Sequence, residues 1–214
     1  MLIYIVRHGE TNANVNGYLQ GWTDDPLNDN GILLAEITGR QMKDIKFDYC
    51  FSSPLKRAKE TAEIIIRESG NNTLITIDNR LIEIDMGSWE RKKYRPGERE
   101  VDKKAIQQFF SNPFHFEGFP QGETIFQVCA RTQSFLKELI SRDDDNIYLV
   151  STHGVALRAM LNYLYEDKKD FWHGHVPYNC SVSVIEAKGG KGRIVIDDKV
   201  YYELDQVIDQ YANY

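Results

Sequence analysis

Arg7 and His8, adjacent residues near the start of the chain, have the side chains that chemistry on an anionic ligand requires. A guanidinium binds phosphate or carboxylate through two parallel hydrogen bonds, and a histidine is a nucleophile or proton carrier near neutral pH. The pair follows the apolar run 2–6, which predicts a strand of a parallel sheet that is buried on both faces. Ligands of open α/β sheets bind at the carboxyl ends of such strands, and Gly9 allows the backbone to approach a ligand closely. A solvated strand end is the alternative for an isolated Arg-His pair.

The same pattern recurs twice along the chain. His153 follows the apolar run 147–150 and precedes a glycine and a helical stretch. Arg57 follows a short strand predicted over 48–51, and the Ser53-Pro54 pair indicates that a helix begins just before it. The first turn of a helix already favours an anion through its free N–H groups. Cations or histidines at three strand-to-helix junctions of one parallel sheet predict a site for an oxyanion.

With these residues in this order, the chain resembles the histidine phosphatase superfamily, and within it the phosphoglycerate mutase-like family. The matching segments run in family order from residue 2 to about residue 185. They are Arg7-His8-Gly9-Glu10-Thr11 with Asn14, Gln20–Asp24 with Leu27 and Gly31, Ser52–Ala58 with Thr61, Glu83 with Gly87, Trp89 and Glu90, and Thr152-His153-Gly154.

The resemblance implies a role for each matching residue. His8 is the implied nucleophile that forms a phosphohistidine, and Glu83 is the implied acid and base. Arg7, Arg57 and His153 are the implied phosphate binders, so neither a metal nor a cofactor is expected. The remaining implied phosphate or substrate contacts are Asn14, Gln20, Gly21 and Gly154. These roles suit phosphoryl transfer, in which catalysis is mostly positioning and charge stabilisation around the equatorial oxygens.

Composition sets limits on the function. A chain of 214 residues with 42% hydrophobic content is long enough for a sizeable core, and we expect one domain over 1–214. The net charge of −6 argues against nucleic-acid binding, and no apolar stretch approaches the ~20 residues that span a bilayer. Three widely spaced cysteines indicate reduced thiols, and therefore a cytoplasmic protein. The expected partner is a small phosphorylated metabolite, and a homodimer is left open.

Alternation of strands and helices predicts a three-layer α/β/α sandwich with a mostly parallel sheet. The resemblance implies the same fold with one strand antiparallel to the rest. Helices are predicted over about 29–43, 55–68, 125–140 and 155–164, and strands over 2–6, 48–52, 74–77, 147–151, 181–185, 193–196 and 200–203.

The segment 84–121 does not fit the alternation. It is rich in charged residues and in phenylalanine, and it directly follows Glu83. We interpret it as a small lid that folds over the carboxyl ends of the strands. The alternative is a solvated charged loop with a satellite apolar cluster.

Other residues of suggestive type are weaker candidates. His173 and His175 alternate as a metal pair would, but no cysteine or carboxylate at ligand spacing accompanies them, so we interpret them as surface or structural residues. Glu10 and Asp24 are interpreted as organisers of the loop after the first strand.

Three functions compete at this point. The first is a metal-independent phosphatase of small phosphomonoesters, the second a bisphosphoglycerate-dependent phosphoglycerate mutase, and the third a non-catalytic binding protein. Retention of His8 and Glu83 argues against the third. The segment 83–90 resembles the phosphatases, because mutases of the family usually carry a Glu-Arg-His-Tyr-Gly type segment there. Arg91 stands where those phosphatases usually have glycine, and a cation there could bind a second anionic group of the substrate.

Overall fold

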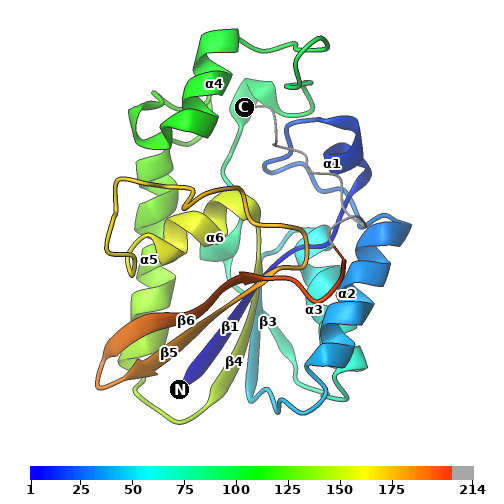
Figure 1. The fold of residues 1–214 in the computed structure, drawn as a ribbon, viewed down its shortest axis with the longest axis vertical. Helices are drawn as coiled ribbons and strands as arrows, with labels where there is room; N and C mark the ends of the chain where they lie inside the picture. Colours follow the sequence, from blue (N-terminus) through cyan, green and yellow to red (C-terminus); the bar gives the residue numbers. More distant parts are fainter. Residues whose placement is uncertain (204–214) are drawn as a thin grey trace.

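A six-stranded sheet in the order β3-β2-β4-β1-β5-β6 forms the centre of residues 1–203, the part of the chain that the computed structural model describes (Figure 1). Strands β1 to β4 are parallel, and β5 runs antiparallel to both β1 and β6. One strand therefore runs against the rest, as the resemblance implies. The strands are β1 Leu2–Arg7, β2 Tyr49–Ser52, β3 Ile75–Ile77, β4 Ile147–Thr152, β5 Val182–Lys188 and β6 Lys191–Lys199.

Helices cover both faces of the sheet, which confirms the three-layer prediction. Alternate side chains of a strand point to opposite faces. Thus Ile3 and Ile5 of β1 pack with helices α5 (Ile125–Ser141) and α6 (Gly154–Leu161). Val6 packs in a different cluster, which includes residues of helix α3 (Lys56–Glu68). Helix α2 (Asp29–Gln41) contacts α3 on that face (Figure 1).

Two predictions about loops and edges need correction. The strand expected over 193–196 is part of a longer strand, β6, whereas the residues of the strand expected over 200–203 lie outside the sheet. The reason is that β5 begins at Val182, opposite Lys199, so the residues after Lys199 have no strand to pair with. The loop after β1 contains a short helix, α1 (Asn12–Asn16), which Thr11 caps and the left-handed Gly17 ends. Residues 204–214 of the expected domain lie outside the described residues.

The segment 84–121, interpreted above as a lid, is packed against the sheet domain rather than being a solvated loop. It contains an unpredicted helix, α4 (Lys103–Ser111), whose N-terminus is capped by the Asp102 side chain. Phe109, Phe116 and Phe119 are buried in a cluster shared with residues of α5 and α6. Burial of these rings stabilises the lid on the sheet domain, because each buried phenylalanine contributes roughly 1.5–3 kcal/mol.

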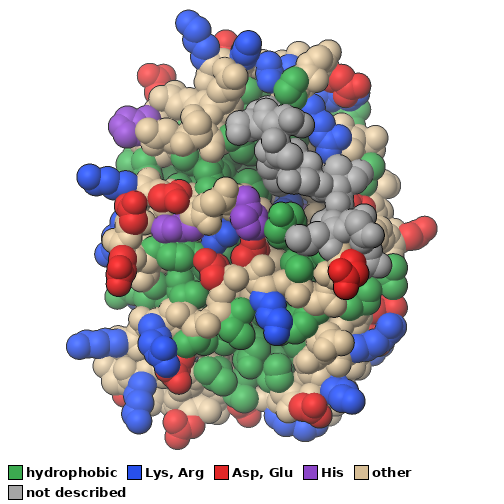
Figure 2. All heavy atoms as spheres, viewed as in Figure 1, with side chains coloured by type: hydrophobic (Ala, Val, Ile, Leu, Met, Phe, Trp, Pro, Cys, Tyr) green, Lys and Arg blue, Asp and Glu red, His purple; other side chains and the backbone are tan. Residues whose placement is uncertain are grey.

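Charged residues lie mainly on the surface. On the face seen in Figure 2, acidic and basic side chains are interspersed. Within residues 1–203, none of the helices combines the length and the apolar character that crossing a membrane requires.

Candidate active site

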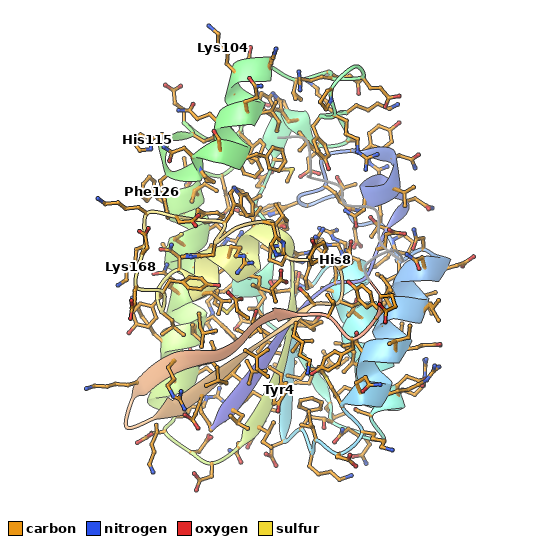
Figure 3. The ribbon with its side chains drawn as sticks, in the orientation of Figure 1. Tyr4, His8, Lys104, His115, Phe126 and Lys168 are labelled. Atoms are coloured by element: carbon orange, nitrogen blue, oxygen red, sulfur yellow. The ribbon has the colours of Figure 1, made fainter. Side chains whose placement is uncertain are left out.

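His8 lies at the carboxyl end of β1, below the lid (Figure 3). Its Nδ1 donates a hydrogen bond to the Gly9 carbonyl at 2.7 Å, because a carbonyl oxygen can only accept. In the neutral ring this leaves the lone pair on Nε2. Burial, followed by the charges of Arg57 and Arg7, holds the pKa of His8 well below its usual value. The ring is therefore neutral and nucleophilic at neutral pH.

The register of the sheet brings the two strand-end histidines together. Arg7 of β1 pairs with Thr152 of β4, so the residues that follow them, His8 and His153, are neighbours. The centres of their rings lie 5.1 Å apart. His153 is fully buried, and its Nε2 is 2.7 Å from the Ser53 hydroxyl. Burial and the charge of Arg57 are the main causes of a pKa of His153 well below the usual value.

Two buried arginines flank His8. The Arg7 guanidinium donates to the Pro177 carbonyl and lies beside Gly154. Arg57 lies in the first turn of α3, where its Nη1 donates to the Thr23 carbonyl at 2.6 Å and its Nη2 to the Gly21 carbonyl at 2.7 Å. Burial lowers the pKa of Arg57 to about 10, so this side chain remains a cation at neutral pH.

Glu83 is buried with its carboxyl group against the start of α6. Its Oε1 accepts from the N–H groups of Ile84 at 2.9 Å and Ala156 at 3.0 Å, and its Oε2 accepts from Val155 at 3.1 Å. Burial nevertheless dominates these bonds and raises the pKa of Glu83. A carboxyl group with a raised pKa keeps its proton to a higher pH and is suited to general acid catalysis.

These side chains meet at one cavity of about 470 Å³, a volume that includes its open mouth. Six of the nine predicted site residues line it: Arg7, His8, Asn14, Gln20, Glu83 and Gly154. Arg57 and His153 are fully buried next to this wall rather than on it, and Gly21 contributes the carbonyl that holds Arg57. The structure thus brings the predicted residues together.

The weaker candidates make structural contacts. The Glu10 carboxylate accepts from Asn28 at 2.9 Å, and the Asp24 carboxylate accepts from the N–H of Lys56 at 2.6 Å, so both organise the loop between β1 and α2. His173 stacks on Tyr165, and His175 lies 3.1 Å from Asp198. The described residues contain no group of three histidine, cysteine or acidic side chains placed to hold a metal ion.

The sequence profile of the histidine phosphatase superfamily (branch 1) matches residues 3–197. The chain belongs to this superfamily. A Danio rerio relative named probable fructose-2,6-bisphosphatase TIGAR A is 39% identical over 141 residues, which are 64% of this chain. The chain spans about half, 53%, of that relative's length. A relative from Erwinia tasmaniensis named probable phosphoglycerate mutase GpmB is 29% identical over 86% of this chain and 84% of its own.

The solved structure of Bacillus stearothermophilus YhfR has the same fold, with a TM-score of 0.85 and 31% identity over 93% of this chain and 97% of its own. The predicted family and fold are therefore confirmed. The relatives of this superfamily member include proteins named as phosphatases and as phosphoglycerate mutases.

Arg91 is where this histidine phosphatase departs from the glycine pattern. Its φ of +60° lies in the left-handed region, which explains why glycine suits the position in other members. The Arg91 side chain is exposed and pairs with Asp25 at 2.8 Å. It does not line the cavity, so the structure gives no support to its predicted contact with a second anionic group.

Glu90 has a structural role that the sequence does not reveal. Its carboxylate accepts from the N–H groups of Gly21, Trp22 and Thr23 at 3.2, 2.7 and 3.2 Å, and also from the Thr23 hydroxyl. The same loop supplies the two carbonyls that hold Arg57. Glu90 therefore positions Arg57 through this loop.

Arg131 of α5 supports Glu83 in a similar way. Its guanidinium donates to the Ile82 carbonyl at 2.5 Å and the Glu83 carbonyl at 2.9 Å, and it pairs with Glu123 at 2.8 Å. These contacts fix the backbone that carries the Glu83 carboxyl group. The two contacts with backbone carbonyls join residues about 50 positions apart in the sequence, so no local pattern predicts them.

We expect Glu90→Gln to lower kcat/KM about 10–100-fold, because hydrogen bonds to a charged group contribute ~1.5–3 kcal/mol each and a glutamine amide nitrogen cannot accept them. The variant should have a lower kcat as well as a higher KM, since a displaced Arg57 weakens stabilisation of the transition state. Glu98→Gln is the matched control, because Glu98 is an exposed partner of Lys93. Equal kinetics of the two variants would contradict the positioning role.

Proposed function

We propose that the protein is a metal-independent phosphatase that hydrolyses small phosphomonoesters through a phosphohistidine on His8. The observation that carries this proposal is the hydrogen bond from His8 Nδ1 to the Gly9 carbonyl. It leaves Nε2 as the nucleophile on a ring that lines the same cavity as Arg7 and Glu83.

The proposed reaction has two steps. In the first, Nε2 of His8 attacks phosphorus, the ester P–O bond breaks, and the Glu83 carboxyl group gives its proton to the leaving oxygen. In the second, the Glu83 carboxylate takes a proton from water, the water oxygen attacks the phosphohistidine, and inorganic phosphate leaves as the P–N bond breaks. Glu83 ends as it began, protonated for the next cycle.

Arg7, Arg57 and His153 are the proposed partners of the phosphoryl oxygens. Arg57 Nε and His153 Nδ1 are buried polar atoms that have no hydrogen-bond partner within residues 1–203. When the Ser53 hydroxyl donates to Nε2 of neutral His153, Nδ1 carries the proton and can donate it to an acceptor. A phosphoryl group would supply acceptors for both atoms.

The proposal predicts that activity survives an excess of chelator and that added magnesium is not required. The guanidinium groups and the histidine supply the charge stabilisation that magnesium supplies in other phosphoryl-transfer enzymes. Phosphate release is measured after exhaustive dialysis against chelator. Loss of activity that one particular metal restores would contradict the prediction and return attention to His173 and His175.

A mutase is the second candidate, because the Erwinia tasmaniensis relative is named a probable phosphoglycerate mutase. A mutase must keep water from the phosphohistidine while its intermediate reorients, which requires a closed pocket. The segment 83–90, which resembles the phosphatases of the family rather than its mutases, favours water as the acceptor.

The experiment that tests the proposed function measures phosphate release and phosphoglycerate interconversion in one preparation, with bisphosphoglycerate present. We expect phosphate release from several phosphomonoesters and little interconversion. Interconversion that exceeds phosphate release by orders of magnitude would establish the mutase instead.

A further inference from the structure

The catalytic cavity has two chemically distinct halves. Its polar side chains, Arg7, His8, Asn14, Gln20 and Glu83, surround the reacting phosphate in the proposed reaction. The rest of the wall is mostly apolar or aromatic: Tyr18, Leu19, Met86, Tyr94, Phe109, Phe110, Val155, Trp172 and Val176. The leaving group of a bound phosphomonoester has to lie against this second half.

Four aromatic rings of the second half hold one another in place. Phe110 stacks on Trp172 with ring centres 6.3 Å apart, and Tyr94 lies 5.7 Å from Phe110. Phe109 meets Trp172 edge to face at 5.8 Å, and the Trp172 indole N–H donates to the Phe109 carbonyl. The aromatic wall is therefore formed before substrate binds, and binding an apolar group against it requires little reorganisation.

Cations are scarce on the cavity wall. Among the lining residues of the described chain, Arg7 is the sole basic side chain, and it flanks the reacting phosphate. Three basic residues of the lid are engaged elsewhere. Arg91 pairs with Asp25, Lys93 pairs with Glu98, and Arg95 donates to the carbonyls of Asn14 and Val15.

A second anionic group on the substrate would thus enter an apolar half-cavity on whose wall residues 1–203 place no basic side chain. Transfer of an unpaired charge out of water into such surroundings is strongly unfavourable. An apolar or aromatic leaving group gains instead from the removal of its surface from water.

We propose that the preferred substrates are monophosphate esters of apolar, planar alcohols, and that the cavity discriminates against phosphomonoesters with a second anionic group. This inference rests on the proposed phosphatase function and specifies its substrate class. By this inference the chain differs in substrate preference from enzymes that act on bisphosphates or phosphoglycerates, the activities for which two of its relatives are named.

The test compares 2-phenylethyl phosphate, glycerol phosphate and 3-phosphoglycerate. All three are esters of alkyl alcohols, so the comparison reports recognition rather than the quality of the leaving group. We expect kcat/KM for 2-phenylethyl phosphate to exceed that for 3-phosphoglycerate by about 100-fold, and that for glycerol phosphate to lie between them.

Variants assign the preference to the aromatic wall. Phe110→Ala should lower the ratio of kcat/KM for 2-phenylethyl phosphate to that for glycerol phosphate about tenfold. Phe110→Arg should raise kcat/KM for 3-phosphoglycerate relative to glycerol phosphate, because it adds a cation to the wall. Phe114→Ala is the matched control, since Phe114 belongs to the same lid but packs on Phe126 and Phe171 outside this cavity. We expect this control to keep the wild-type ratios.

The outcomes separate this inference from the proposed function. Phosphate release that is faster from 3-phosphoglycerate than from 2-phenylethyl phosphate overturns the inference and leaves the phosphatase intact. Equal ratios in Phe110→Ala and Phe114→Ala also overturn it. If the protein releases phosphate from none of the three esters, both the substrate inference and the proposed phosphatase function are overturned.

Discussion

His8→Ala should lose about 10⁴-fold or more in phosphate release, on the scale of other enzymes that lose a covalent nucleophile. Within the described chain, no other side chain that lines the cavity combines a neutral ring with a free lone pair facing the proposed phosphate site. His153, whose ring centre lies 5.1 Å from that of His8, has Nε2 hydrogen-bonded to Ser53 and is buried next to the cavity wall rather than on it. Steady-state phosphate release from a phosphomonoester measures the effect.

His115→Ala is the matched control for the loss of a histidine. His115 is exposed on the lid, on the outer side of the molecule and far from His8 (Figure 3). It should keep wild-type activity, and thermal unfolding of both variants checks that each is folded. A folded His8→Ala protein that retains most of its activity would refute the covalent mechanism.

Glu83→Gln should have the second largest effect, and its size should depend on the leaving group. The glutamine keeps the shape of the side chain but has no transferable proton, and general acid catalysis typically contributes ~10²–10⁴-fold. An alkyl phosphate, whose leaving oxygen needs a proton, should lose this full amount. p-Nitrophenyl phosphate should lose less, because its leaving group is stable as an anion. Equal losses on the two substrates would show that Glu83 is structural.

The pH profile gives an independent readout of Glu83. Burial raises the pKa of Glu83, so the carboxyl group keeps its proton to a higher pH than an exposed one. Activity on alkyl phosphates should fall as the pH rises through this raised pKa, because the acid is lost above it. The Glu83→Gln variant should lack this limb. A limb of unchanged position in the variant would assign the titration to another group.

The residues that sequence reasoning places correctly are those whose signals are local. Arg7 and His8 follow an apolar strand directly, and Arg57 follows a helix-start signal, so their positions at the carboxyl edge can be predicted from neighbours in the chain. The buried stripe of α3 also follows from helical spacing, since Ala58, Ala62 and Ile65 are all fully buried.

Contacts between distant segments set the rest of the site. Glu90 bonds to a loop about 70 residues earlier in the chain, and Arg131 bonds to the segment that carries Glu83. Neither partner is visible in a local pattern. The same limit explains the edge of the sheet, where the end of β6 depends on where its partner β5 begins. The direction of the Arg91 side chain could not be predicted for a different reason. Its residue type and position in the sequence do not show that, at a φ of +60°, the side chain points to Asp25 and not into the cavity.

The proposed reaction passes through one covalent intermediate, and trapping it is the most direct test. A phosphomonoester with a radiolabelled phosphate is mixed with the protein and quenched within one turnover. We predict an acid-labile, base-stable phosphoenzyme whose label maps to the peptide that contains His8. It should be absent from His8→Ala and accumulate in Glu83→Gln with p-nitrophenyl phosphate, because water activation in the second step is impaired there. Turnover without any labelled protein, or a label on His153 instead, would contradict the mechanism.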